Sequence, residues 1–268
     1  MRRSWYLLAA LLIVELIGNV AYGLTNPPAR KNTIRVMTYN IHHCNPPSAG
    51  TRIEIDAIAR VITKENPDLV ALQEVDVNTE RSGKGINQAK ELAKQTGMHF
   101  FFSKAIDHQG GDYGVAVLSR FPILDSTRFI LPIDPAIGGE VRTIAAITVE
   151  VAKGKKIVFA STHLDLKEQN RISQAELIVK HFGETKLPMI LGGDFNALMD
   201  SQVMRFLGQH FSRSCQDCKP TIPVVNPNRA IDFILFRPDR GFKSQTTRVI
   251  DEQYASDHLP VVAELTVP

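Results

Sequence analysis

Short apolar runs recur along the chain and predict buried β-strands, separated by segments with helical periodicity. In residues 51–65, Ile55, Ile58 and Ile62 line one face of an expected helix that Thr51 is placed to cap. Gly97 follows a second such segment as an expected stop signal. The predicted strands are 34–40, 69–73, 98–103, 113–119, 142–151, 156–162, 188–193, 230–236 and 259–266, and the predicted helices are 51–65, 85–96, 168–182 and 200–208.

The order of these elements predicts mixed sheets. A short turn at 153–156 joins two predicted strands, which should pair as an antiparallel hairpin. A strand–helix–strand unit occurs twice, at 34–73 and 156–193, and such units pair their strands in parallel. The pattern therefore predicts an α/β fold of two mixed, mostly antiparallel sheets packed face to face, with helices outside.

The N-terminal residues resemble a targeting segment more than a part of the fold. Arg2 and Arg3 precede an apolar run over 5–20, and Ala21-Tyr22-Gly23 offers small residues for cleavage. We expect a signal peptide over 1–23, with an uncleaved anchor as the alternative, and a short linker over 24–32. The absence of a Ser/Gly linker further along predicts one domain over 33–268.

Charge and cysteine content narrow the function classes. The formal net charge is +3 and the basic residues are dispersed, which does not indicate the basic stripe typical of nucleic-acid binding. Cys215 and Cys218 suit a local disulfide or two plain thiols, and no second Cys/His pair completes a zinc site. Cys44 would be left unpaired.

Acids, amides and imidazoles follow the predicted strands repeatedly. Because loops at strand ends carry the reactive groups of α/β scaffolds, these side chains predict one composite site. Oxygen-rich donors and imidazoles together suit a hard divalent cation and a phosphate ester. The residues are Asn40, Glu74, His163, Asp194, Asn196, Asp232, Asp257 and His258.

Three of these side chains suggest specific chemical roles by their residue type. Asp194 can orient a water molecule and Asn196 can donate to a phosphoryl oxygen, although the pair could equally form an Asx turn. The two glycines before Asp194 would let the backbone approach a ligand. His163 could protonate a leaving oxygen. The Gly-x-Ser-x-Gly motif of serine hydrolases is absent and nothing marks Cys44 as a thiolate, so water is the expected nucleophile.

Seven short motifs stand in an order that resembles the endonuclease/exonuclease/phosphatase family, which includes DNase I-like nucleases, AP endonucleases, inositol-polyphosphate phosphatases and neutral sphingomyelinases. The likeness covers about residues 33–267. The motifs are Thr38-Tyr39-Asn40-Ile41, Leu72-Gln73-Glu74, the Tyr-Gly-Val-Ala-Val-Leu-Ser-Arg run at 113–120, Thr162-His163-Leu164-Asp165, Gly193-Asp194-Phe195-Asn196, Ile231-Asp232-Phe233 and Ser256-Asp257-His258.

This resemblance implies a four-layer, DNase I-like α/β sandwich and a role for each matching residue. For the metal, the resemblance implies Glu74 as the main Mg²⁺ ligand, with Asn40 and Asp257 nearby. For catalysis, it implies Asp194 as the acid that orients water, Asn196 as the phosphate-binding amide, His258 as the imidazole on the scissile phosphate held by Asp232, and His163 as a second histidine. Arg120 and Arg142 would be phosphate contacts or scaffold pairs. His42 and His163 depart from the AP-endonuclease branch, which has Asp and Tyr there. Asp165 is expected to act only through its neighbours.

The sequence thus predicts an exported, periplasmic or secreted, Mg²⁺-dependent phosphoesterase, monomeric, with Mn²⁺ or Ca²⁺ as alternative cations and membrane tethering as an alternative location. Alternative functions are a nuclease for extracellular DNA or RNA, a phospholipid or sphingomyelin-type phosphodiesterase, a serine esterase and a non-enzymatic binding protein. The loops at 42–50, 76–86, 104–112, 132–140 and 213–229 would select the substrate. Arg81, Lys84 and Arg229 either line the mouth of the site or lie on the solvated surface.

Overall fold

A computed structural model describes residues 32–237 and 240–268. The predicted signal peptide and all of the 24–32 linker except its last residue lie outside the described residues. Among the helices of the described part, none combines the length and the apolar composition that crossing a bilayer requires.

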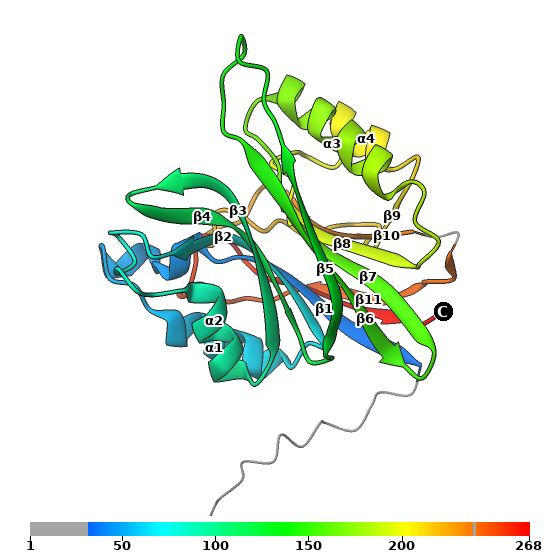
Figure 1. The fold of residues 1–268 in the computed structure, drawn as a ribbon, viewed down its shortest axis with the longest axis horizontal. Helices are drawn as coiled ribbons and strands as arrows, with labels where there is room; N and C mark the ends of the chain where they lie inside the picture. The colour runs from blue at the N-terminus through cyan, green and yellow to red at the C-terminus, as the bar shows by residue number, and fades with distance from the viewer. Residues whose placement is uncertain (1–31, 238–239) are drawn as a thin grey trace, which may run out of the picture.

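Two six-stranded sheets lie face to face at the centre of the molecule (Figure 1). The first has the order β11-β12-β1-β2-β4-β3 and the second β5-β6-β7-β8-β10-β9. Their strands are β1 (Thr33–Asn40), β2 (Leu69–Val77), β3 (His99–His108), β4 (Gly111–Ser119), β5 (Ile123–Leu131), β6 (Arg142–Ala152), β7 (Lys155–His163), β8 (Met189–Asp194), β9 (Ser212–Arg213), β10 (Asp232–Phe236), β11 (Ser244–Val249) and β12 (Val261–Thr266).

Helices cover the outer face of each sheet (Figure 1). α1 (Ile55–Glu65) and α2 (Gln88–Thr96) pack on the first sheet, and α3 (Glu168–Phe182) and α4 (Gln202–Leu207) pack on the second. Three apolar clusters fill the three gaps between the four layers: one under each helix pair and one between the sheets. The structure confirms the predicted four-layer sandwich.

Two parallel strand pairs lie at the middle of the sandwich. β1 pairs in parallel with β2 through α1, and β7 pairs in parallel with β8 through α3, whereas the other described neighbours are antiparallel. The repeated strand–helix–strand pattern in the sequence is therefore confirmed as two equivalent parallel units. Because parallel strands end at the same edge, each unit delivers its last residues to one side of its sheet.

The glycines before Asp194 are required by sheet packing, and their predicted approach to a ligand stays a prediction. A Cβ added to Gly192 would lie 2.8 Å from Cβ of Ala71 and 3.2 Å from Cβ of Thr38 on the opposite sheet. A Cβ on Gly193 would lie 2.6 Å from the carbonyl oxygen of Thr162 on the neighbouring strand. Both positions are small because backbone and methyl groups already fill the space.

Several local predictions need correction. Thr51 does not cap α1: the helix begins at Ile55, and Glu54 occupies the cap position without a side-chain hydrogen bond. The backbone N–H of Glu54 donates to the carbonyl of Cys44, a residue outside the helix. Gly97 does end α2, in the left-handed conformation with φ +66°.

Three strands were not predicted, and each lies at the edge of a sheet. β5 and β11 are mostly exposed, and β9 has only two residues. In β5 the apolar residues at the two ends flank an exposed polar segment, and in β11 the exposed residues are mostly polar, so neither sequence shows the pattern of a buried strand.

Of the two cysteine states that the sequence left open, the structure has the local disulfide. Cys215 and Cys218 form a disulfide, and Cys44 is free and buried.

Candidate active site

The polar side chains predicted to converge lie at one end of both sheets. Asn40 is the last residue of β1, and His163 and Asp194 are the last residues of β7 and β8. Asp232 begins β10, and it sits directly opposite Asp194 because β10 runs antiparallel to β8. The structure therefore confirms that segments far apart in sequence meet at a single edge of the sandwich.

Glu74 occupies an irregularity in β2. The register shifts between Leu72 and Val75, and Glu74 itself has φ +56°, a left-handed conformation that a non-glycine residue rarely adopts. This bulge turns the carboxylate toward Asn40, whose Nδ2 donates to Glu74 Oε1 at 3.0 Å and to Asp194 Oδ2 at 3.1 Å. Strain of this kind concentrates at functional sites.

The Glu74 carboxylate is ionised in this setting. Burial alone would raise its pKa, but the combined effect of His43, His163, Asn40 and His258 outweighs burial and lowers the pKa well below its ordinary value. His43 Nδ1 lies 4.0 Å from Oε2. An ionised, hydrogen-bonded carboxylate is the form that a cation ligand requires.

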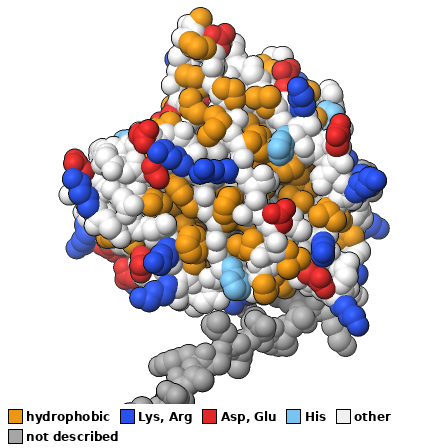
Figure 2. Space-filling view, viewed as in Figure 1, with side chains coloured by type: hydrophobic (Ala, Val, Ile, Leu, Met, Phe, Trp, Pro, Cys, Tyr) orange, Lys and Arg blue, Asp and Glu red, His pale blue; other side chains and the backbone are white. Residues whose placement is uncertain are grey.

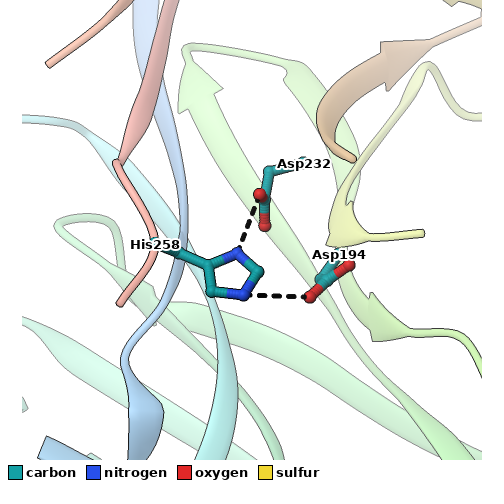
Figure 3. A group of neighbouring side chains, drawn as sticks. All are labelled: Asp194, Asp232 and His258. Atoms are coloured by element: carbon teal, nitrogen blue, oxygen red, sulfur yellow. Dashed lines mark hydrogen bonds and ion pairs between the residues drawn. The ribbon is translucent and has the colours of Figure 1, made fainter. Parts of the chain in front are cut away.

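Asp232, His258 and Asp194 form a buried acid–imidazole–acid arrangement (Figure 3). His258 Nδ1 lies 2.9 Å from Asp232 Oδ2, and Nε2 lies 3.8 Å from Asp194 Oδ2. Burial opposes charge on the imidazole, but Asp232, and after it Asp194 and Asp257, outweigh it and raise the pKa of His258 to about 10. The ring is therefore an imidazolium held between two carboxylates.

The same three residues have a spacing that a metal ion could span, with ligand atoms all within 4.8 Å of one another. Both nitrogens of His258, however, already face carboxylate oxygens. A protonated imidazole has no lone pair to give a metal. We therefore interpret this group as an ion triad.

The pKa of Asp194 shifts in the opposite direction to that of Glu74. Its burial, and then the neighbouring charge of Asp232, raise the pKa of its carboxyl, while His258 and the hydrogen bonds from Asn196 and Asn40 oppose the rise. A carboxylate with a raised pKa is a stronger base, which suits a group that orients and deprotonates water.

His163 is neutral, so the predicted role as a protonated acid is not supported. Arg142 NH1 lies 3.3 Å from Nδ1, and Asn196 Nδ2 lies on the other side of the ring, so an N–H donor faces each ring nitrogen. Burial first, and Arg142 second, lower the pKa of His163 well below its ordinary value. Nε2 then faces Asp194 Oδ2 at 3.6 Å and Asn196 Nδ2 at 3.0 Å.

Asn196 forms an Asx turn and also lies in the site. Its backbone N–H donates to Asp194 Oδ1 at 2.9 Å, and its Nδ2 donates to the Leu164 carbonyl at 2.9 Å. With φ +48° it is a second left-handed residue at this edge. The Asx turn that the sequence posed as an alternative is therefore present, and the amide lies beside His163, while its role toward a phosphate stays a prediction.

Arg142 lies in the site and brings neighbours that sequence reasoning did not assign. Its NH1 pairs with Glu140 Oε1 at 2.7 Å, and its buried Nε has no hydrogen-bond partner among the described residues. Tyr113, on β4, is buried and pairs with Asp76 on β2. Burial, and after it the charge of Glu74, raise the pKa of the Tyr113 hydroxyl. Tyr113 is the first residue of the 113–120 motif, which was the available signal for it.

Arg120 does not belong to the site. It follows β4 at the end beside Leu69, the first residue of β2, whereas Glu74 lies toward the other end. Its Nε donates to the Pro67 carbonyl and its NH2 to Asn66 Oδ1 at 2.5 Å. The arginine therefore fastens the α1–β2 turn, and the prediction that it contacts phosphate is wrong.

The predicted role of Asp257 as a metal ligand near Glu74 stays a prediction. Its carboxylate is half-buried and accepts a 3.4 Å hydrogen bond from Ser256 Oγ. Among the described residues, no hydrogen bond or ion pair links it to Glu74. Ser256 Oγ also donates to the Asn40 carbonyl at 2.7 Å, which attaches this loop to the end of β1.

The remaining sequence candidates lie around the site. Asp165 accepts from the backbone N–H groups of Glu140 and Lys167, so it fixes the 132–140 loop, in keeping with an indirect role. Arg81 is bound in bidentate fashion to the buried Asp76 and lies over Tyr113. Lys84 and Arg229 are exposed.

Comparison with known proteins agrees with this geometry. The model of the Endonuclease/Exonuclease/phosphatase family matches residues 37–258, a family of phosphoester hydrolases that generally depend on divalent metals. No curated protein matches the chain.

Solved structures resemble the chain over most of its length. An endonuclease/exonuclease/phosphatase protein from Beutenbergia cavernae is 24% identical with a TM-score of 0.74, covering 88% of this chain and 72% of that one. A mannosyl-6-phosphatase from Bacteroides thetaiotaomicron is 21% identical with a TM-score of 0.70, covering 87% and 99%. The catalytic domain of human Nocturnin, with bound sulfate, is 21% identical with a TM-score of 0.68, covering 91% and 100%.

At these identities the solved structures establish the shared fold, whereas the family match spans most of the chain. The chain therefore belongs to the endonuclease/exonuclease/phosphatase family and is a hydrolase of phosphoester bonds.

Proposed function

We propose that this chain is an exported, Mg²⁺-dependent phosphoesterase in which Asp194 orients a water molecule for in-line attack on phosphorus. One observation carries the proposal: Asn40 joins the carboxylates of Glu74 and Asp194, and the same Asp194 faces the imidazolium of His258. A cation ligand, a base and a cationic hydrogen-bond donor thus lie within a few bond lengths of one another.

The side chains of the site have separate roles in the proposed reaction. The carboxylate of Asp194 holds and deprotonates the water, which its raised pKa favours. The imidazolium of His258, oriented by Asp232, donates to the phosphoryl oxygens as negative charge grows there. The Nδ2 of Asn196, beside Asp194, supplies a second donor. The neutral His163 lies next to both residues.

The donors also fit a hard divalent cation. Glu74 is ionised and left-handed in its bulge, and Asn40 fixes its Oε1, so this carboxylate and the Asn40 amide would hold the ion, with Asp257 as a further candidate. A bound Mg²⁺ would supply Lewis-acid polarisation of the phosphoryl oxygens. Mn²⁺ and Ca²⁺ are the alternative occupants.

Hydrolysis of p-nitrophenyl phosphate and bis-p-nitrophenyl phosphate tests the proposal and separates monoesterase from diesterase activity. We expect turnover with Mg²⁺ that stops in chelator, and a loss of about 10³-fold or more in Asp194→Asn. Asp125→Asn, an exposed carboxylate on β5, is the matched control and should retain the parent rate. Parent-like turnover by Asp194→Asn would remove this residue from the mechanism, and chelator-insensitive activity would favour the metal-independent serine-esterase alternative.

The substrate class is the next question. On the face in Figure 2, acidic and basic side chains are interspersed without a continuous basic band, which gives no support there to nucleic-acid binding. The similarity to a mannosyl-6-phosphatase makes sugar phosphates a first choice for testing. A panel of sugar and inositol phosphates, sphingomyelin, glycerophosphodiesters, DNA and RNA would assign the class by relative kcat/KM.

Export and a monomeric state complete the proposal. The charged and apolar pattern of residues 1–23 supports export, and a disulfide between Cys215 and Cys218 suits an oxidising compartment. Mass spectrometry of the N-terminus after cell fractionation would distinguish a cleaved protein starting near residue 24 from an anchored one. Light scattering during size-exclusion chromatography would report the oligomeric state.

A further inference from the structure

Thr221 is a fully buried residue that connects the two halves of the Asp232–His258 pair. Its Oγ1 donates to Asp232 Oδ2 at 2.5 Å, and its carbonyl accepts from the backbone N–H of Leu259 at 2.8 Å. One residue thus contacts the carboxylate by its side chain and the neighbour of the imidazole by its backbone.

Thr221 is itself held rigidly. Its N–H donates to the Arg229 carbonyl at 2.8 Å, and Ile222 and Arg229 exchange backbone hydrogen bonds that close the loop between them. On its other side, the disulfide of Cys215 and Cys218 closes the segment that leads into Thr221. Both cysteines and Asp232 line a shared cavity of about 20 Å³, so this segment lies near the acid.

The hydrogen bonds to Asp232 are unevenly distributed. Oδ2 receives both the Thr221 hydroxyl and His258 Nδ1, whereas the buried Oδ1 has no hydrogen-bond partner within the described part of the chain. Without the hydroxyl, only the imidazole would fix the rotation of the carboxylate. The imidazole would then lose the rigid partner that aims its Nε2 toward Asp194.

We propose that Thr221 is a positioning residue for the reaction: its hydroxyl locks the Asp232 carboxylate and so holds His258 in the orientation that serves the phosphate. This role rests on the proposed phosphoesterase function. Because Thr221 is fully buried and its side chain bonds Asp232, its effect on kcat is exerted through His258.

A pair of substitutions at one position isolates the hydroxyl. Thr221→Val keeps the shape of the side chain and removes the donor, whereas Thr221→Ser keeps the donor. We expect Thr221→Val to lower kcat by about 10- to 100-fold with KM unchanged, as other partners behind reactive side chains do, and Thr221→Ser to remain within a few-fold of the parent.

Thr143→Val is the matched control for the loss of a buried threonine hydroxyl. Thr143 is equally buried, but its Oγ1 bonds Ser103 Oγ at 2.7 Å and the Phe129 carbonyl at 3.1 Å, away from the ion triad. It should lose stability while keeping the parent kcat. A parent-like kcat in Thr221→Val, or an equal loss in Thr143→Val, would overturn the proposal.

A second measurement separates this proposal from the proposed function. The His258 Nδ1–H proton in its hydrogen bond to Asp232 should give a downfield NMR signal in the metal-free parent, in Thr221→Ser and in Thr143→Val, and the signal should broaden or shift in Thr221→Val. An unchanged signal in Thr221→Val would refute the positioning role even if the protein hydrolysed none of the substrates offered, an outcome that would by itself refute only the proposed function.

Discussion

Replacing Gly192 by alanine should weaken the contact between the two sheets just below the active site. The new Cβ would lie 2.8 Å from Cβ of Ala71, about 1 Å inside the usual carbon–carbon separation. Overpacking of this kind costs about 1–3 kcal/mol, and alanine regains about 0.5–1 kcal/mol over glycine in a strand. We therefore expect Gly192→Ala to lower the free energy of unfolding by about 0.5–2 kcal/mol.

A double-mutant cycle tests the cause of this loss. Ala71→Gly alone should cost about 1–2 kcal/mol, because it removes a buried methyl group and adds a flexible residue. In the combined variant the methyl of residue 192 takes the space vacated at residue 71, although Thr38 still crowds it at 3.2 Å. The double variant should then be about 1 kcal/mol more stable than the sum of the single changes.

Urea unfolding in chelator, followed by circular dichroism, measures all four proteins under one condition. Each kcal/mol should also shift the melting temperature by about 2–4 °C in a chain of this length. If the two changes add within about 0.3–0.5 kcal/mol, the side chains do not meet, and the packing explanation for Gly192 is refuted.

Three further predictions follow from single features of the structure. Arg120→Gln should lower stability by about 1–3 kcal/mol without changing KM, since its described hydrogen bonds run to the α1–β2 turn; a raised KM at parent stability would restore its phosphate role. The double change of Cys215 and Cys218 to serine should lower the free energy of unfolding in urea by up to about 2 kcal/mol, and an unchanged value would show that the disulfide adds no stability. Because Asp232 helps to raise the folded-state pKa of His258 to about 10, above the ordinary 6.5, the ion pair stabilises the fold fully below pH 6.5 and loses this contribution as pH rises toward 10. His258→Gln should therefore destabilise the metal-free protein more at pH 6 than at pH 9, and the reverse order would contradict the ion pair.

The sequence was sufficient for the layers and for the polar groups that end central strands. Central strands such as β1 and β8 are largely buried and rich in apolar residues, and the polar residues that end them, Asn40 and Asp194, meet where the two sheets face each other. The edge strand β5 was missed because its apolar residues stand at its two ends, around the exposed polar segment 125–128. The prediction therefore located the central strands and the edge strand β3, and missed the edge strands β5, β9 and β11.

Local backbone geometry was the second limit. Nothing in the run Leu72-Gln73-Glu74 announces the bulge that turns Glu74 to the left-handed conformation, since the residue is not a glycine. Partners distant in sequence were equally hidden: Thr221 reaches Asp232 across a loop, and the side chain of Arg120 turned out to serve a turn 53 residues away. Motifs identify which residues carry chemistry, whereas only coordinates show what each side chain touches.

The most direct test of the central claim is the Mg²⁺ dependence of bis-p-nitrophenyl phosphate and p-nitrophenyl phosphate hydrolysis by the parent and by Glu74→Gln, which keeps the shape of the side chain and removes its charge. The account predicts that the variant loses about 10²-fold or more in kcat/KM and requires a higher Mg²⁺ concentration for half-maximal activity. A variant that matches the parent in rate and in Mg²⁺ requirement would contradict the claim that this carboxylate holds the catalytic cation.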